Sequence, residues 1–394
     1  MHTENRKRLV KACDGALIVL SGYDAMQGSG DMAAPFTQEA SFWWATGISE
    51  PGWRVIIEGV HGGRTTLVRP ELSHVQEIFD GTTSDDVALQ VSGAEKVVSS
   101  KEFEPLLRQL SRTHSIARTI AVKHPYEFTP NPASSNLVEL LSRIFSSTQD
   151  CSQKINELRA IKSPEELHRM QAAINLTNDA FAEVRQRLET YKHEYELEAD
   201  FIQLFRRKNA THAYEPIVAS GVNACTLHYV GNHDKLSAKS MVLIDIGARV
   251  NGYCADVTRT YCVRPTKRQM AVHAAVVDAQ RRCIDLLGPD VSIVDYFREV
   301  DEIMKDALQS LRLLDDRSDE AAYRKYFPHS ISHGLGVDPH DPLGRPRSFR
   351  AGMVVTVEPG IYIPEEAIGV RIEDDILITR DGSRNLSGSL STGL

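Results

Sequence analysis

Residues 242–261 read VLIDIGARVNGYCADVTRTY, and this stretch predicts the architecture of the C-terminal half of the chain. Two runs rich in β-forming residues flank Asn251-Gly252, which is the strongest short-range signal for a two-residue β-hairpin turn. With such a turn, Asp245 lies opposite Thr258, and Asp256 lies two positions further along the same face. We therefore expect the two aspartates to be diagonal neighbours, roughly 7–8 Å apart at the backbone.

The residues beside these aspartates are apolar on both faces of the predicted hairpin, namely Leu243, Ile244, Ile246 and Val257. This pattern favours a buried hairpin over an exposed one that carries two solvated aspartates. A buried carboxylate costs several kcal/mol unless it is paired or bound to a metal. The pair therefore indicates a cation site.

A second hairpin is expected from residues 354–360, VVTVEPG, and 369–378, GVRIEDDILI. These runs carry the carboxylates Glu358 and Glu373. Arg371 shares the strand face of Glu373 because the two residues are two positions apart. Two interpretations of Arg371 stay open: an ion pair with Glu373, or a cation that supports the site and contacts substrate.

Three of the fourteen histidines fall within twelve residues between the two hairpins, in residues 328–341, PHSISHGLGVDPHD. A lone histidine is usually a packed core residue, but here glycines between the histidines allow the backbone to approach another group closely. His329 and His333 share a face in either a helix or a strand. The third histidine is His340.

Five of these side chains together form a donor set for metal ions: Asp245, Asp256, Glu358, Glu373 and His333. One divalent cation would neutralise two of the four carboxylates, so the set predicts two cations. Carboxylates suit harder ions, which favours Mn²⁺ over Zn²⁺ or Co²⁺. A pair of such ions typically activates a water molecule for hydrolysis.

These motifs (IDIGA, ADVTRT, HGLG, EPGIY and VRIEDD) resemble those of the pita-bread metallopeptidases, and specifically the Xaa-Pro aminopeptidase (aminopeptidase P) and prolidase branch. The resemblance covers residues 155–380 and extends to the N-terminal part through FWWATGISEPG at 42–52. It implies that Asp256 and Glu373 bridge two metals. Asp245 and His333 would be terminal ligands on opposite metals.

The resemblance also implies roles for the remaining site residues. Glu358 would bind a metal and accept the proton of the attacking water, which becomes a metal-bridging hydroxide. The histidines near the substrate would be His228, His329 and His340, with His340 or His228 stabilising the oxyanion. Tyr362, in EPGIY, resembles a tyrosine found near the site of the aminopeptidase members.

Three functions are compatible with this resemblance. The first is an Xaa-Pro aminopeptidase, which removes the residue before proline from peptides longer than two. The second is a prolidase restricted to Xaa-Pro dipeptides, and the third is a non-catalytic binding protein of the same fold. Tyr362 and the context of residues 335–341 favour the aminopeptidase, and the complete ligand set disfavours the binding protein.

The amino-acid composition limits the kinds of molecule that this protein can bind. A length of 394 residues with 42% hydrophobic and 25% charged residues predicts a globular protein of about two to three domains. The net charge of −8 without a basic stripe argues against nucleic acid. No apolar run approaches the ~20 residues of a membrane span. Six cysteines without Cys-x-x-Cys spacing predict reduced thiols in the cytoplasm. A homodimer or homotetramer is expected.

The predicted fold class is α+β. Residues 1–155 alternate short strands with helix-like runs, which indicates a smaller α/β accessory domain with a mixed sheet. Residues 156–394 form the pita-bread catalytic domain, whose first helix begins at the capping box of Ser163 and Glu166. Residues 146–150 are expected to be a loop. Trp43, Trp44 and Trp53 fit either a packed core or a rim and subunit interface.

Overall fold

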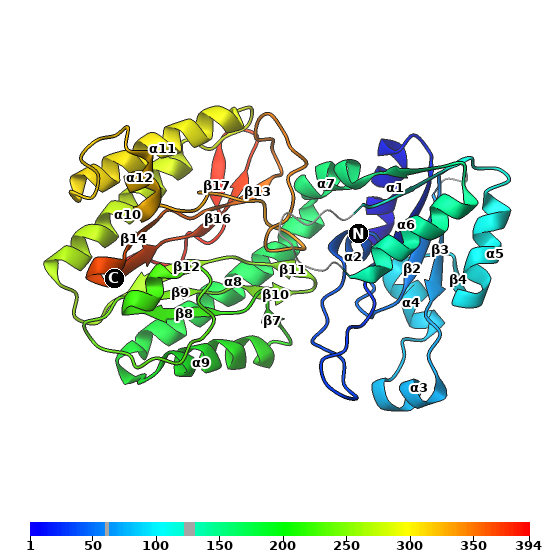
Figure 1. The fold of residues 1–394 in the computed structure, drawn as a ribbon, viewed down its shortest axis with the longest axis horizontal. Coiled ribbons are helices and arrows are strands. Elements are labelled where there is room, and N and C mark those ends of the chain that lie inside the picture. The colour runs from blue at the N-terminus through cyan, green and yellow to red at the C-terminus, as the bar shows by residue number, and fades with distance from the viewer. Residues whose placement is uncertain (60–62, 122–130) are drawn as a thin grey trace. The chain divides into compact units, whose positions relative to one another are not determined.

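The computed structural model describes residues 1–59, 63–121 and 131–394. The chain divides into two compact units, Met1–Leu158 and Arg159–Leu394, which are coloured blue to cyan and green to red in Figure 1. The second unit contains all the predicted metal ligands.

The N-terminal unit is built on a six-stranded mixed sheet with the order β4-β3-β2-β1-β5-β6. The strands β1, β2 and β3 pair antiparallel, and β4, β5 and β6 join them parallel. This confirms the predicted α/β unit with a mixed sheet. The strand bounds are β1 Leu17–Ser21, β2 Arg54–Glu58, β3 Arg64–Arg69, β4 Lys96–Ser99, β5 Ile116–Thr119 and β6 Ser147–Asp150.

Helices cover this sheet, and the three tryptophans pack in the interior. Trp43, Trp44 and Trp53 are 8%, 1% and 2% exposed, which confirms the core interpretation. The loop expected at 146–150 is wrong, because β6 pairs with β5 through a polar edge strand that is half-exposed. The helix bounds are α1 His2–Ala12, α2 Ala40–Thr46, α3 His74–Asp80, α4 Asp85–Ser92, α5 Ser100–Leu110, α6 Pro132–Ile144 and α7 Ser152–Ala160.

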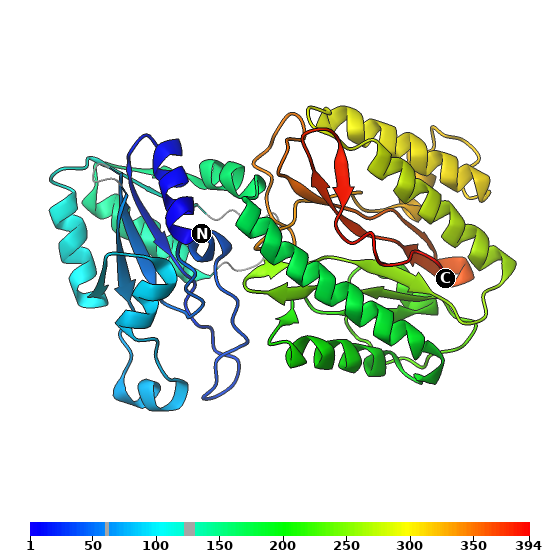
Figure 2. The same ribbon diagram turned by 180° about the vertical axis from the view of Figure 1, so that it is seen from behind.

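In the C-terminal unit, two helix pairs enclose the strands, α8 with α9 on one side and α10 with α11 on the other (Figures 1 and 2). The predicted capping box starts α8: the Ser163 N–H donates to Glu166 Oε2 at 2.7 Å, and Ser163 Oγ accepts from the Glu166 N–H at 3.3 Å. None of the helices in the described ranges is long and apolar enough to cross a membrane. The bounds are α8 Pro164–Gln186, α9 Glu194–Arg207, α10 Lys267–Asp285, α11 Ile293–Ser310 and α12 Glu320–Tyr326.

The strands of this unit are short and form small sheets with the orders β11-β10-β7, β12-β9-β8, β13-β16-β17 and β14-β15. Their bounds are β7 Thr211–His212, β8 Ile217–Ser220, β9 Val242–Asp245, β10 Ala248–Val250, β11 Tyr253–Cys254, β12 Thr258–Tyr261, β13 Val354–Val357, β14 Gly360–Ile363, β15 Ile368–Arg371, β16 Asp374–Ile378 and β17 Ser383–Asn385.

The first hairpin, which we call the Asp hairpin, has the predicted register. Thr258 pairs with Asp245 at its base, and Val250 pairs with Tyr253 at its tip. The turn residues Asn251 and Gly252 have φ of 47° and 83°, as the favoured hairpin turn requires. Between the base and the tip the regular ladder is interrupted, and Asp256 lies in this interruption.

The second hairpin, which we call the Glu hairpin, is also interrupted, although the sequence predicted a continuous return strand over 369–378. Its base pairs β13 with β16, and its tip pairs β14 with β15 in the same register. Continuation of that register places Glu358 opposite Glu373, within the interruption. Both carboxylates therefore lie where the ladder is broken rather than inside a strand.

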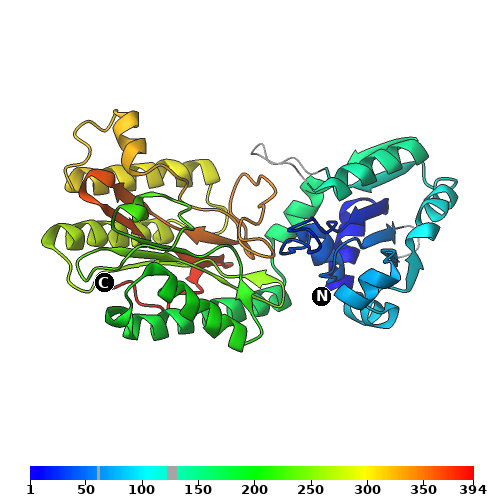
Figure 3. The ribbon, with the colours of Figure 1, turned by 60° about the horizontal axis from the view of Figure 1, so that its bottom comes forward.

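The two hairpins lie side by side along β12 and β15. The Glu373 N–H donates to the Thr258 carbonyl at 3.0 Å, and Thr260 Oγ1 donates to the Arg371 carbonyl at 3.0 Å. One apolar core lies under α10 and α11, and another lies under α8 and α9. Figure 3 shows the strands held between these helix pairs. The junction of the hairpins is consequently buried from both sides.

Candidate metal centre

The interruptions of the two hairpins bring acidic side chains from both of them together. Ligand atoms of Asp256, Glu373 and His333 all lie within 4.8 Å of one another. Asp256 comes from the Asp hairpin and is 5% exposed, and Glu373 comes from the Glu hairpin and is 2% exposed. Glu373 is oriented by Thr258, whose Oγ1 donates to its Oε2 at 2.7 Å.

Asp245 is linked to this cluster by a tyrosine. Tyr214 Oη lies 2.6 Å from Asp245 Oδ1 and 2.6 Å from Asp256 Oδ1. A phenol has one proton, so Tyr214 can donate to only one of the carboxylates at a time. The close approach of both oxygens shows that these aspartates converge on one point, as their predicted diagonal placement requires.

Glu358 completes the group from the other side. Its Oε1 lies 3.5 Å from His333 Nε2, and its Oε2 lies 3.7 Å from His329 Nδ1. His333 Nε2 also lies 3.7 Å from Asp256 Oδ2. The structure therefore brings all five predicted ligands into one cluster.

Arg371 forms its ion pair across the junction of the hairpins. Its Nη2 lies 2.5 Å from Asp245 Oδ2, so the partner is Asp245 and not the Glu373 that the sequence suggested. The alternation of side chains along a strand predicts only which residues of that strand share a face with Arg371. The guanidinium instead reaches a residue of the neighbouring hairpin. Arg371 Nη1 also donates to Tyr362 Oη at 2.9 Å, and that oxygen lies 2.8 Å from His329 Nε2. Tyr362 and His329 thus belong to the same network.

The other predicted histidines lie at the edge of the cluster. The rings of His333 and His340 stack with centroids 3.9 Å apart. His228 lies near enough to both His340 and His329 to interact with them electrostatically. His340 and His228 are exposed, in contrast to the buried Asp245, Asp256 and Glu373.

The carboxylates cannot all be charged here without cations. Burial, followed by repulsion from Asp245, raises the pKa of Asp256 well above its ordinary value. Burial and Glu373 raise the pKa of Glu358, and burial and Asp256 raise the pKa of Glu373. Removal from water and mutual repulsion both penalise the charged forms.

The two inner histidines are neutral at physiological pH. Burial, followed by His340, lowers the pKa of His333 to about 4. Burial, followed by Arg371, lowers the pKa of His329 to about 4. A neutral imidazole presents a free electron pair, which is the form that binds a metal.

The donor set fits divalent cations. Burial and mutual repulsion make the charged forms of these carboxylates costly. Divalent cations relieve this cost better than protons do near neutral pH, because each ion can neutralise two carboxylates. Carboxylate oxygens with a single imidazole suit an ion such as Mn²⁺. The sulfur atom of Cys254, by contrast, lies 3.3 Å from the Val337 carbonyl and serves as buried packing.

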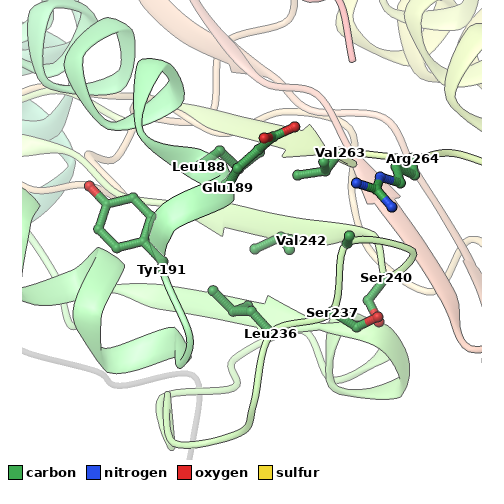
Figure 4. A pocket seen from close by; sticks show the side chains of 10 residues that line it. Leu188, Glu189, Tyr191, Leu236, Ser237, Ser240, Val242, Val263 and Arg264 are labelled. Carbon is green, nitrogen blue, oxygen red and sulfur yellow. The ribbon is translucent and has the colours of Figure 1, made fainter.

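A separate cavity of 140 Å³ lies at the other end of β9 (Figure 4). Its lining includes Leu188, Tyr191, Leu236, Val242 and Arg264. None of the predicted site residues contributes to it. We therefore assign the chemistry to the acidic cluster and not to this cavity.

Tyr214 and Asp375 were missed by the sequence analysis. The pairing of β7 with β10 places Tyr214 beside the aspartates, and a tyrosine two residues after a two-residue strand carries no usable signal. Asp375 Oδ2 accepts the N–H of Asp256 at 3.2 Å. Its position in the EDD motif could have marked it as a neighbour of Glu373.

Two family models match the chain. The model described as metallopeptidase family M24 matches residues 168–380, and the model described as aminopeptidase P, N-terminal domain, matches residues 2–120. The first match spans the whole acidic cluster. The second lies within the N-terminal unit.

Relatives are similar over nearly the whole chain. The Xaa-Pro aminopeptidase 3 of Mus musculus is 33% identical, with 95% of this chain and 78% of that protein covered. The Xaa-Pro aminopeptidase of Haemophilus influenzae is 32% identical, with 96% and 91% covered. The structure of aminopeptidase P from E. coli with the inhibitor Pro-Leu is 29% identical and has a TM-score of 0.87, covering 100% of this chain and 96% of that one. This likeness confirms the predicted pita-bread fold with its smaller N-terminal domain.

Proposed function

Because the chain belongs to metallopeptidase family M24 and carries the N-terminal domain of aminopeptidase P, we propose that it is an aminopeptidase with two metal ions that cleaves the bond between an N-terminal residue and a following proline. The convergence of five donor groups from two interrupted hairpins and the intervening loop carries this proposal. The names of its relatives support the same specificity.

Asp245, Asp256, His333, Glu358 and Glu373 would hold the two cations, with Asp256 and Glu373 shared between them. The cations would supply the positive charge that polarises a carbonyl and acidifies a water molecule. Asp256 and Glu373 suit the shared role because they are the most deeply buried of the four carboxylates, at 5% and 2% exposed.

Glu358 is the group placed to move a proton. From its place 3.5 Å from His333 Nε2, the carboxylate would accept the proton of the attacking water and pass it to the leaving nitrogen. His329 stands beside it in the neutral form and links it to Tyr362 and Arg371. Arg371 pairs with Asp245 and holds its carboxylate in place.

A peptide bond before proline has no N–H, so the enzyme must recognise the substrate through other atoms. His340 and His228 are exposed at the edge of the cluster, where either ring can donate a hydrogen bond to the substrate carbonyl oxygen in the transition state. Tyr362 and Arg371 would contact the substrate from the opposite side.

The experiment is hydrolysis of Ala-Pro-Ala and Ala-Pro by protein reconstituted with Mn²⁺, Zn²⁺ or Co²⁺. We expect release of alanine from Ala-Pro-Ala, fastest with Mn²⁺. Cleavage of Ala-Pro without cleavage of Ala-Pro-Ala would identify a dipeptidase. Lack of any cleavage and of any bound metal would identify a non-catalytic binding protein.

Other expectations accompany this function. We propose residues 1–155 as the accessory domain and 156–394 as the catalytic domain. A homodimer or homotetramer and a cytoplasmic location stay predictions. Size-exclusion chromatography with light scattering would measure the oligomeric state directly.

A further inference from the structure

Residues 333–341, which we call the histidine loop, connect two histidines of the site. The loop begins at His333 and ends at Asp341, directly after His340. Its ends are tied together, because the Asp341 N–H donates to the Gly334 carbonyl at 2.8 Å. The two histidine rings consequently meet and stack.

The first part of this loop is fixed by the Glu hairpin. The Thr356 N–H donates to the His333 carbonyl at 2.9 Å, and the Leu335 N–H donates to the Val354 carbonyl at 3.1 Å. These bonds extend the sheet by one short segment. The position of His333 therefore depends on backbone bonds to β13.

The last part of the loop is fixed differently, by buried charges. Asp341 is 2% exposed and lies between Lys162 and Arg159, which are 5% and 3% exposed. Lys162 Nζ donates to Asp341 Oδ2 at 3.1 Å, and Arg159 Nη2 forms an ion pair with Asp341 Oδ1. Arg159 Nη2 also lies 3.1 Å from Asp338 Oδ2, a carboxylate that is 40% exposed.

The backbone of the loop is shaped to admit this carboxylate. A Cβ atom at Gly336 would overlap Asp341 Oδ2, so only glycine allows the approach. Asp341 is thus enclosed by two cations and a glycine backbone. Removal of its charge would leave the buried Lys162 without its counter-charge and weaken the hold of Arg159 on the loop, which the protein would relieve by moving the loop.

His340 has little else to hold it. It is exposed, and within the described residues its ring makes no hydrogen bond. Its stacking on His333 and the fixed backbone of Asp341 are what define its position. A shift of Asp341 would therefore pass directly to His340, while the bonds to β13 would keep His333 in place.

We propose that Asp341, clamped by Lys162 and Arg159, is a positioning residue that sets the ring of His340 for the reaction. The consequence for activity rests on the proposed function, but the ring position itself does not. A purely structural cluster would instead stabilise the fold without a specific effect on His340.

The first test measures ring geometry by NMR of ¹³C-labelled histidine in metal-free and Zn²⁺-loaded protein, with His340→Gln identifying the His340 signal. Stacked rings shift each other's proton resonances. We expect Asp341→Asn to remove this shift from His340, and Asp338→Asn, the control on the same loop, to leave it. An unchanged His340 signal in Asp341→Asn would overturn the proposal.

The second test is a double-mutant cycle on kcat/KM for Ala-Pro-Ala. We expect Asp341→Asn alone to lower kcat/KM by about 10²-fold, the effect of a misplaced catalytic group. In a His340→Ala background the same change should lower it by less than about 3-fold, because the group it positions is gone. Equal losses in both backgrounds would show a structural role and overturn the proposal.

Two further variants keep the test decisive. If Asp341→Asn does not fold, Lys162→Met replaces it, and Lys162→Arg should restore most of the activity and the stacked His340 signal. If the wild-type protein does not cleave Ala-Pro-Ala, the proposed function fails, and the NMR experiment alone decides whether Asp341 positions the ring. Failure of one proposal is thereby distinguished from failure of the other.

Discussion

The Asp hairpin and the Glu hairpin reach the same result by different means. Each keeps one register from base to tip, and each places acidic residues at a break in the ladder: Asp256 in the Asp hairpin, and Glu358 and Glu373 in the Glu hairpin. The Asp hairpin closes with the two-residue Asn251-Gly252 turn, and the Glu hairpin closes through a 3₁₀ turn at Pro364–Glu366. The comparison teaches that the break, and not the turn, is what the site requires.

The hairpins also differ in the charged groups that they contribute to the acidic cluster. The Glu hairpin contributes Arg371 as well as two carboxylates, and this cation pairs with Asp245 of the Asp hairpin. Among the described residues, no lysine or arginine forms an ion pair with Asp256, Glu358 or Glu373. One carboxylate is therefore paired with a cation of the protein, whereas the other three would need metal ions to balance their charge.

The largest effect should follow from removing, in either hairpin, the carboxylate that we propose is shared between the cations. We expect Asp256→Ala and Glu373→Ala each to abolish Mn²⁺-dependent hydrolysis of Ala-Pro-Ala, because either change removes one of the two carboxylates proposed to be shared between the cations. Metal content by mass spectrometry should fall in parallel. Glu365→Ala, at the exposed turn of the Glu hairpin, should retain activity. Near-normal turnover in one of the two ligand variants would break the equivalence of the hairpins.

A smaller effect is expected from the cation that joins the hairpins. Arg371→Lys keeps the charge but cannot bind Asp245 and Tyr362 with one planar group. We expect kcat/KM to fall by about 10–100-fold, as for other residues that orient metal ligands. Arg268→Lys, which alters a surface pair with Glu366, is the matched control. Full activity of Arg371→Lys would show that charge alone suffices.

The pH dependence of stability distinguishes the balanced carboxylate from the three others. In the metal-free folded protein, the pKa values of Asp256, Glu358 and Glu373 are raised above those of the unfolded chain. The folded state therefore holds protons that the unfolded state has lost, and stability falls as pH rises through the raised values. We expect Tm in EDTA to fall as the pH rises from the ordinary carboxylate range, about 4, into the neutral and alkaline range.

Mn²⁺ should reverse this loss, since it replaces the protons, and its stabilising effect should grow with pH. Above pH 7, His329 and His333 are neutral in both states and do not contribute, because their pKa values in the folded protein are about 4. Differential scanning calorimetry with and without metal measures the difference. A metal-free Tm that rises over this pH range would contradict the account.

The smallest effects concern the two turns. Gly252 has φ of 83°, so Gly252→Ala should destabilise the protein by about 1 kcal/mol. Ala367, which ends the turn of the Glu hairpin, has φ of 52°, so Ala367→Gly should stabilise it by up to about 1 kcal/mol. Thermal unfolding would measure both. A loss of stability in Gly252→Ala and a gain in Ala367→Gly would confirm that the turns affect stability. Activity should be unchanged in both variants.

The parts that sequence predicted well depend on local rules. The Asn251-Gly252 turn, the register of the Asp hairpin and the capping box of Ser163 each follow from residues within a few positions of one another. The five acidic and imidazole donors were found because their residue types imply one chemistry. The structure gathers them in one cluster, and their roles as ligands await the metal analysis above.

The parts that sequence missed depend on contacts between distant segments. The partner of Arg371 lies on the other hairpin, more than a hundred positions away. Tyr214 reaches the aspartates only because β7 joins β10. The strand β6 is polar, since an edge strand needs little apolar character, and composition alone therefore marked it as a loop.

The breaks in the ladders have a further consequence, for the order of folding. The Glu373 N–H donates to Thr258 of the other hairpin, and the Glu358 N–H donates to Ile331. Each hairpin can therefore form by itself without presenting a complete set of donors, which arises only on docking. Divalent ions should accordingly slow the unfolding reaction while leaving the refolding rate nearly unchanged. They would then stabilise the folded protein kinetically without taking part in the folding nucleus.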